Sequence, residues 1–194
     1  MSDALARLRN VLGRYLRGRR GGSAVEMALG ALLLTIPLLN VADLAFYAYR
    51  KMQVENAAQV GAQAAWAACN TVSKWPATDP ARCPELASAI SNAITSTSLG
   101  GGVVQMAGSP TEGFYCQTTA GDLQMVGTQG TVGVRPTKVP TDCSGVTKAS
   151  NPTAPPGDYI QVRVAFVYKP IFRNVSLVSL LKTPITKTTW VRLV

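Results

Sequence analysis

The pattern of hydrophobic and polar positions divides the chain into two parts. The first part has the pattern of one long helix, and the second has mostly the pattern of short β-strands separated by turns. From Ala24 to Tyr49 almost every residue is apolar or small. About 20 such residues, rising 1.5 Å each, cross the hydrocarbon core of a bilayer. Small residues then recur every three to four positions as far as Ala68, with Gln, Glu and Asn between them. This pattern predicts one helix over residues 24–68, membrane-spanning first and amphipathic afterwards, and we expect its small-residue face to pack on the chain's own globular domain.

Three residues interrupt the apolar run in its outer half. Pro37 removes one backbone hydrogen bond from a helix, so we expect a kink or a local opening there. Asn40 and Asp43 follow, and a carboxylate within a span is costly unless it faces protein or water. Asp43 either has such surroundings or already lies at the outer headgroups, and the sequence leaves both possibilities open.

After residue 84 the chain alternates short apolar runs with turns rich in Gly, Pro, Asn and Ser. A helix is predicted from Glu85 to Ile94, and residues 174–181 fit either a helical turn or a buried segment. Candidate strands cover residues 103–106, 113–117, 123–126, 131–134, 159–168 and 183–193. In the 159–168 run, one face carries Ile160, Val162, Val164 and Phe166. We therefore predict an α+β fold, with the long N-terminal helix packed on a small antiparallel β-sheet.

Charge is concentrated before the apolar run. The chain has a net charge of +9, and six of its 19 basic residues are arginines that precede Gly21. Without residues 1–21 the net charge falls to +4. A basic arm beside an apolar span is typical of cytoplasmic retention, so we expect a cytoplasmic N-terminus and no nucleic-acid partner.

All four cysteines, Cys69, Cys83, Cys116 and Cys143, lie beyond the apolar run. None forms a Cys-x-x-Cys pair and the chain has no His, so a metal site is disfavoured. An even cysteine count beyond a span fits an oxidising compartment. The sequence leaves the three possible disulfide pairings open, of which neighbour pairing is the simplest.

The junction between the arginines and the apolar run has the composition of a processing signal. Gly21 and Gly22 offer an accessible, extended backbone, and a cut between them makes Glu26 the fifth residue of the product. The new α-amino group and the Glu26 carboxylate would both be costly near a membrane if unpaired. In staggered helices, the amine of one subunit can meet Glu26 of its neighbour. This pair would set the axial register and penalise misassembly.

These residues resemble a known family. The run Arg19 to Leu29 is similar to the Arg-Gly-x-x-Ala-Val-Glu-Phe-Ala-Leu opening of the TadE-like minor pseudopilins of tight-adherence (Flp) pilus systems, in the type IV pilin superfamily. The resemblance continues over residues 47–65, the 159–168 strand and Trp190 to Arg192, and it is weak in the cysteine-containing middle. Met27 stands where the family usually has Phe or Tyr.

The resemblance implies a pilin-like fold and three segments: a leader (1–21) removed by an aspartic prepilin peptidase, a transmembrane helix (22–49) and an exported domain (50–194). It implies a single-pass protein of the bacterial inner membrane with a periplasmic C-terminal domain, which acts in assembly or initiation of a Tad/Flp-type pilus. The implied partners are the membrane, the peptidase, other pilins or pseudopilins and pilus-assembly proteins, with no cofactor.

Two other classes of function remain for comparison. An uncleaved single-span protein could display its disulfide-linked domain as an envelope binding or adhesion module. An enzyme is disfavoured because the chain has no His for a nucleophile–base pair, and its acids are dispersed along the sequence without a close pair. We therefore expect no catalytic residues.

Overall fold

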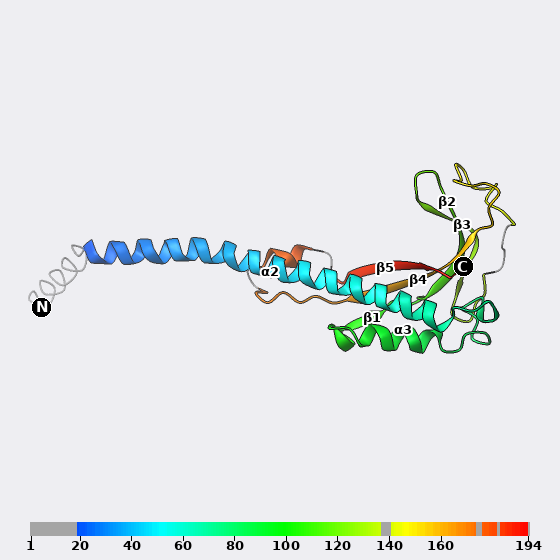
Figure 1. The fold of residues 1–194 in the computed structure, drawn as a ribbon. Coiled ribbons are helices and arrows are strands. Elements are labelled where there is room, and N and C mark those ends of the chain that lie inside the picture. Colours follow the sequence, from blue (N-terminus) through cyan, green and yellow to red (C-terminus); the bar gives the residue numbers. More distant parts are fainter. Residues whose placement is uncertain (1–18, 137–140, 174–175, 182, 194) are drawn as a thin grey trace, which may run out of the picture. The chain divides into compact units, whose positions relative to one another are not determined.

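The computed structural model describes residues 19–136, 141–173, 176–181 and 183–193, so most of the segment predicted to be a leader, residues 1–18, lies outside the described residues. The elements are α2 (Arg19–Ala68), α3 (Leu86–Thr95), β1 (Val103–Gln105), β2 (Thr111–Gln117), β3 (Leu123–Thr131), β4 (Gly157–Phe166) and β5 (Ile185–Arg192) (Figure 1). Short 3₁₀ helices occur at Val72–Lys74, Gly100–Gly102 and Leu177–Leu180. The predicted α+β architecture, with a long N-terminal helix packed on a small antiparallel sheet, is confirmed.

The chain forms two compact units. The first consists of Met1–Phe46 with Pro170–Leu181, and the second of Tyr47–Lys169 with Lys182–Val194. Helix α2 therefore contributes its apolar half to the first unit and its amphipathic half to the second.

In the second unit, β4 is the central strand of an antiparallel sheet. Along one edge it pairs with β5 over its length, from Tyr159 opposite Arg192 to Phe166 opposite Ile185. Along the other edge it pairs first with β2 and then with β1, and β3 pairs with the far edge of β2. Residues of β4 alternate strictly in burial as far as Val164, which fits a strand with one face against the core.

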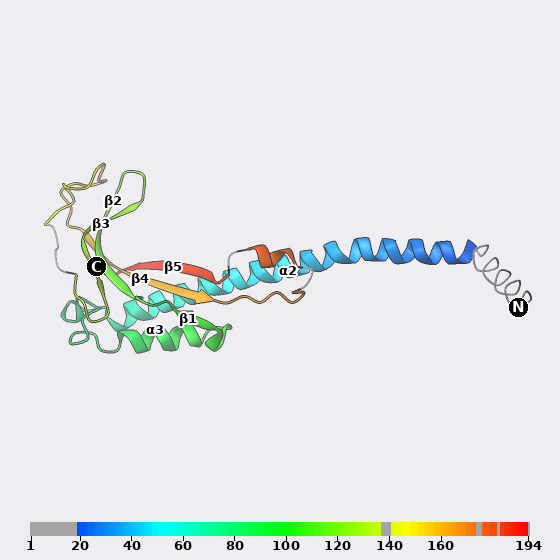
Figure 2. The same cartoon turned by 180° about the vertical axis from the view of Figure 1, so that it is seen from behind.

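The amphipathic half of α2 and helix α3 cover the same face of this sheet (Figure 2). The buried face of α2 is the predicted small-residue stripe, including Val54, Ala57, Ala58 and Ala65. A Cβ atom on Gly61 would lie 3.0 Å from Ile94 Cγ1 of α3 and 3.4 Å from Val162 Cγ1 of β4. Glycine thus permits the three elements to approach closely, and the prediction that this stripe packs on the chain's own domain is confirmed.

The opposite face of the sheet carries an aromatic cluster. The rings of Tyr159 and Trp190 both meet Tyr115 edge to face, with centroids 5.8 and 4.9 Å away. Such aromatic pairs contribute roughly 0.5–1.5 kcal/mol each beyond the area they bury. The cluster ties β2, β4 and β5 together on the face away from the helices.

Two disulfides close loops at the ends of this unit. Cys69, just after α2, is bonded to Cys83, and Cys116 of β2 is bonded to Cys143, so the cysteines are paired with their neighbours in sequence. The first bridge spans 14 residues, and closing a loop of this size stabilises a fold by about 3 kcal/mol in the chain-entropy model.

The structure corrects two local expectations. Residues 123–126 and 131–134 are not two strands, because β3 runs unbroken to Thr131 and residues 131–134 form a turn closed by Val134 N–H to Thr131 C=O. Gly127, with a φ of 84°, lies in an irregularity of the ladder between Val126, opposite Phe114, and Gly130, opposite Glu112. Its conformational freedom therefore forms a bulge within the strand and does not end the strand. Helix α2 also continues through Pro37, so the kink or local opening expected there does not interrupt the helix.

Candidate functional site on the N-terminal helix

The glycine junction is helical. Helix α2 begins at Arg19, so Gly21 and Gly22 do not adopt the extended backbone expected from their composition. The apolar run that follows propagates the helix backward, because each added residue gains one hydrogen bond once the helix is nucleated. Gly22 remains open on all sides, since a Cβ atom there would meet nothing within 4 Å. Two consecutive glycines also weaken this turn by about 1 kcal/mol each relative to alanine.

Glu26 lies on the exposed surface of α2, one turn after Gly22. The side chains around it are exposed and apolar, namely Val25, Met27, Leu29, Leu32, Leu33 and Leu34. A single carboxylate on an otherwise apolar helix surface is costly in lipid without a positive partner. The structure places Glu26 next to Gly22 along the helix and leaves its surroundings free for such a partner.

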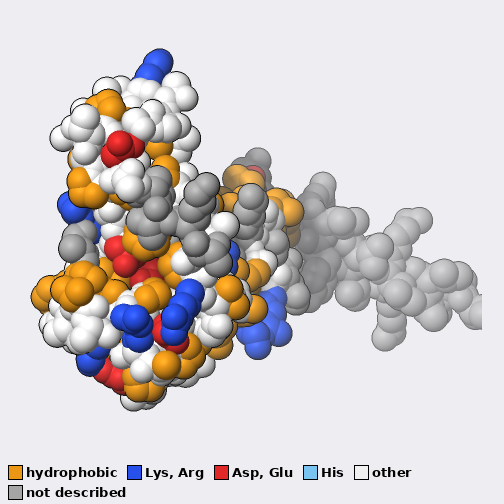
Figure 3. Space-filling view, turned by 90° about the vertical axis from the view of Figure 1, so that its right-hand side faces the viewer, with side chains coloured by type: hydrophobic (Ala, Val, Ile, Leu, Met, Phe, Trp, Pro, Cys, Tyr) orange, Lys and Arg blue, Asp and Glu red, His pale blue; other side chains and the backbone are white. Residues whose placement is uncertain are grey.

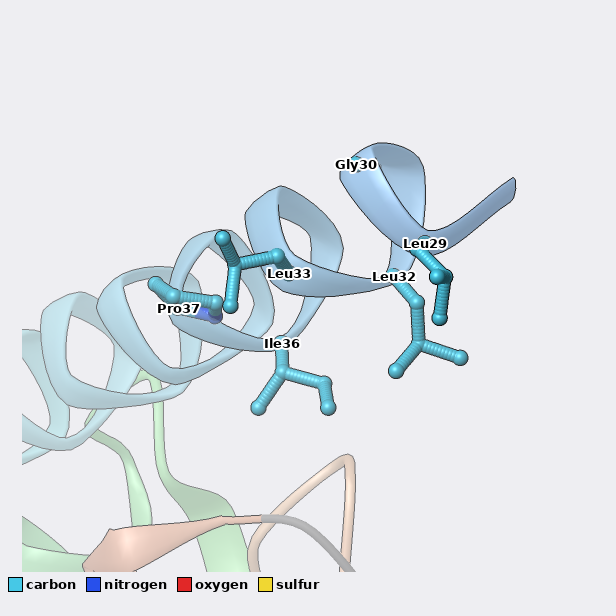
Figure 4. Close-up of a pocket in the computed structure, with 6 residues that line it drawn as sticks. All are labelled: Leu29, Gly30, Leu32, Leu33, Ile36 and Pro37. Atoms are coloured by element: carbon cyan, nitrogen blue, oxygen red, sulfur yellow. The ribbon is translucent and has the colours of Figure 1, made fainter. Parts of the chain in front are cut away.

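An apolar hollow follows Glu26 along the same helix. It is lined by Leu29, Gly30, Leu32, Leu33, Ile36 and Pro37, and Figure 4 shows these side chains projecting outward from neighbouring turns. Over the described residues, α2 is the one helix long and apolar enough to cross a membrane, with a mean hydropathy of 1.9 in its most apolar window. The apolar half of α2 therefore fits a single-pass membrane anchor.

Asn40 and Asp43, in the outer part of the apolar half, have protein partners elsewhere in the chain. Asp43 is 0% exposed, and its two carboxylate oxygens accept hydrogen bonds from the backbone N–H groups of Ile171 (2.9 Å) and Phe172 (3.4 Å). The side-chain oxygen of Asn40 accepts the N–H of Leu177 at 2.7 Å. Of the two possibilities open for Asp43, the structure supports contact with protein.

A second polar cluster was missed by sequence reasoning. Glu112 is 0% exposed and accepts hydrogen bonds from Ala77 N–H (2.9 Å), Thr78 N–H (2.7 Å) and the Thr78 hydroxyl (2.7 Å). Asp158 lies beside it, buried on the helix-facing side of the sheet. The expectation that the acids are dispersed without a close pair is therefore wrong for these two residues. Antiparallel pairing of β2 with β4 brings them together, and pairing register is not visible in residue spacing.

The surroundings of Asp158, Glu112 among them, change the protonation of Asp158. Burial, and then the negative charge of Glu112 with a hydrogen bond between the two side chains, raise the pKa of Asp158 to about 8. Asp158 therefore holds a proton at neutral pH and can donate it to Glu112. Because both side chains are buried, the pair acts as a structural link between the sheet and the loop at residues 77–78.

The surface of the second unit shows no concentration of one charge on the face seen in Figure 3, where basic and acidic side chains are interspersed with apolar ones. In the same unit the buried Asp79 forms ion pairs with both Arg82 and Arg135. Within the part of the chain that the structure describes, no three Cys, Asp or Glu side chains converge to hold a metal ion.

A search of curated proteins and a search of solved structures each found no match to the chain. A family model does match the N-terminal region. The matched segment begins at the glycine junction and ends in the sheet-packing half of α2. Residues 21–63 match the model of the family described as TadE-like protein, which confirms the resemblance over this segment and is consistent with a TadE-like protein of Tad pilus systems.

Proposed function

We propose that this chain is a minor pseudopilin that acts in the assembly or initiation of a Tad/Flp-type pilus. In this proposal residues 1–21 are a cytoplasmic leader, residues 22–49 cross the bacterial inner membrane, and residues 50–194 form the exported domain. The observation that carries it is the TadE-like match, which begins at residue 21, where the sequence predicts the processing junction.

Processing supplies the partner that Glu26 needs. A prepilin peptidase cutting between Gly21 and Gly22 releases an α-amino group at the start of the apolar helix. The amine of one subunit then pairs with Glu26 of another pilin or pseudopilin in a staggered arrangement. Exposure of Glu26 and openness around Gly22 support this step, because both groups are accessible to other proteins. An unpaired charge in an apolar helix bundle costs several kcal/mol, so the pair favours one register.

The Glu26 carboxylate is therefore expected to be required for assembly and not for membrane insertion. Glu26→Ala and Glu26→Gln should each lower pilus assembly by about tenfold or more, the change that ~1.4 kcal/mol of lost pairing produces. The readout is pilus yield from cells in which the variant replaces the wild-type chain, together with the amount of chain in the membrane fraction.

The matched control is Glu55→Ala, which removes another exposed acid of α2. Glu55 pairs with Lys187 of its own domain at 2.6 Å. Exposed pairs of this kind contribute little to stability because water screens them, so assembly should persist. Normal pilus yield in both Glu26 variants, with normal membrane levels, would contradict the proposal.

The alternative is an uncleaved envelope binding module, and a small hollow beside the Cys116–Cys143 bridge is its best support. Tyr115, Tyr159, Asn151 and Arg192 contribute to this hollow, which has a volume of about 180 Å³. Pockets for small ligands usually measure about 300–1,000 Å³, so this one is undersized for that role. The pseudopilin proposal therefore has the stronger structural support.

A further inference from the structure

The segment Pro170–Leu181 lies in the same compact unit as the apolar half of α2. We infer that this segment inserts into the lipid of the outer leaflet, so that the chain enters the membrane a second time without crossing it. We call residues 170–173 and 176–181 the outer-leaflet segment. The inference rests on the proposed function only in taking α2 as a membrane span.

Depth is the first argument. If the hydrocarbon core begins just after Glu26, about 20 residues of helix carry the span to around residue 46. Asn40 and Asp43 then lie roughly 5–9 Å inside the outer boundary, at 1.5 Å per residue. The outer-leaflet segment is attached at these two positions by three backbone N–H groups. A segment attached at that depth must itself lie within the leaflet.

The exposed side chains of the segment suit that depth. Ile171 is 56% exposed and Leu180 is 82% exposed, and Leu177 is exposed as well. Leu177, Val178 and Leu181 also line an apolar groove of about 280 Å³ with Asn40, Val41 and Leu44 of α2. Several large aliphatic side chains on one surface are unfavourable in water. Transfer of one fully exposed Leu or Ile side chain from water into an apolar environment is favourable by about 1.5–3 kcal/mol. Continuity with the exposed apolar side chains of α2 indicates that the same lipid covers both.

The hydrogen bonds made by Asn40 and Asp43 are those a lipid environment demands. A non-helical backbone in hydrocarbon must have its N–H groups satisfied by protein, because no water is available. The carboxylate of Asp43 accepts two such N–H groups at the start of the segment. The side-chain oxygen of Asn40 accepts the N–H of Leu177, the first residue of the Leu177–Leu180 turn. The side-chain oxygen of Ser176 accepts the N–H of Val178. These contacts explain why polar residues are present in the outer half of the span.

Charge favours an anionic lipid surface around the segment. Lys169 and Arg173 are both exposed and lie on either side of Ile171 and Phe172 in the sequence. Long basic side chains extend from an apolar segment to the phosphate level of the bilayer, and each contributes about 1 kcal/mol of attraction to an anionic membrane. The outer-leaflet segment thus combines an apolar surface with one cation of its own, Arg173, and follows a second, Lys169, in the sequence.

The test uses the full chain in nanodiscs of phosphatidylcholine and phosphatidylglycerol, one copy per disc. A lipid-soluble aryl diazirine and a water-soluble diazirine label the chain in parallel, and tryptic peptides are quantified by mass spectrometry. Cleavage after Arg173 and Lys182 isolates residues 174–182, and cleavage after Arg50 isolates the span. We expect the lipid-soluble reagent to label both peptides several-fold more than the water-soluble reagent does.

The outcomes separate the inference from the proposed function. In one outcome, the lipid-soluble reagent labels the span and the water-soluble reagent labels residues 174–182. This outcome overturns the inference about the outer-leaflet segment and leaves the proposed membrane anchor intact. Protection of residues 174–182 from both reagents also overturns it, because protein then covers the segment. A span that escapes the lipid-soluble reagent overturns the membrane anchor itself.

A matched pair of variants tests the surface directly. Leu180→Asp places a charge at the most exposed position of the segment without removing a core contact, so several-fold less lipid-soluble label should reach residues 174–182. Val72→Asp makes the same change at an exposed apolar position of the second unit and should leave that labelling unchanged. Equal labelling in the wild type and in Leu180→Asp would overturn the inference.

Discussion

At the scale of single residues, surroundings determine what each buried carboxyl group does. Asp43 accepts two backbone N–H groups, and Glu112 accepts three donors from residues 77 and 78. Asp158 differs, because among the described residues one of its oxygens has no hydrogen-bond partner, and the charge that acts on it is the like charge of Glu112. Burial and the neighbouring Glu112 carboxylate raise the pKa of Asp158 to about 8, and this makes the second unit sensitive to pH.

The pH dependence has a defined sign. Between about pH 4, the ordinary pKa of an unfolded Asp, and the folded pKa of about 8, the folded chain binds more protons at Asp158 than the unfolded chain. The free energy of unfolding should therefore fall as pH rises through this window. Asp158→Asn keeps a hydrogen-bond donor for Glu112 without titrating, so it should remove this fall and exceed the wild type in stability by about 1–3 kcal/mol near pH 8.

The measurement is denaturant unfolding of the detergent-solubilised chain, followed by tryptophan fluorescence at several pH values. Trp66, Trp75 and Trp190 all belong to the second unit, so the signal reports on that unit alone. Asp122→Asn, at an exposed position, is the control and should retain the wild-type pH profile. A profile for Asp158→Asn that parallels the wild type would contradict the assignment.

At the scale of elements, α2 has a different environment in each half. Its apolar half exposes large aliphatic side chains, and its amphipathic half buries small ones against α3 and β4. Two glycines of this helix mark the difference. A Cβ on Gly61 would press on Ile94 and Val162, whereas a Cβ on Gly30 would meet nothing within 4 Å.

These glycines provide a matched pair of substitutions. Gly61→Ala should lower the free energy of unfolding of the second unit by about 1–3 kcal/mol, because Ile94 is buried and must shift to admit a methyl group. Gly30→Ala makes the same change in the same helix and should leave that stability unchanged. Denaturant unfolding by tryptophan fluorescence measures both, and an equal effect of the two substitutions would show that helix propensity outweighs packing.

Helices and strands whose apolar residues repeat regularly could be predicted from the sequence. Features that depend on how two strands pair could not be predicted. Apolar periodicity predicted α2 from residue 24 to 68, and alternation predicted most of β4 and its buried face. The continuity of β3 through Gly127 was missed, because glycine is typical of turns and the pairing with β2 is invisible in one segment. The same limit applies to Glu112 with Asp158 and to Asp43 with Ile171, which are brought together only by the tertiary fold.

At the scale of the whole molecule, the two compact units account for different parts of the proposed function. The first carries the glycine junction, Glu26 and the apolar surface, and these are the features that meet lipid and other subunits. The second carries the sheet, the aromatic cluster and both disulfides, and disulfides suit the oxidising compartment that the proposal assigns to this unit. The TadE-like match covers residues 21–63 and begins at the glycine junction, so the proposed processing step is the most direct link to pilus assembly.

N-terminal sequencing of the chain extracted from membranes tests this step. In cells that contain a prepilin peptidase, the proposal predicts a mature chain that begins at Gly22, with Glu26 as its fifth residue. The same chain from cells without the peptidase should keep its leader. A chain that retains its leader in both kinds of cell would contradict the account and favour an uncleaved membrane anchor.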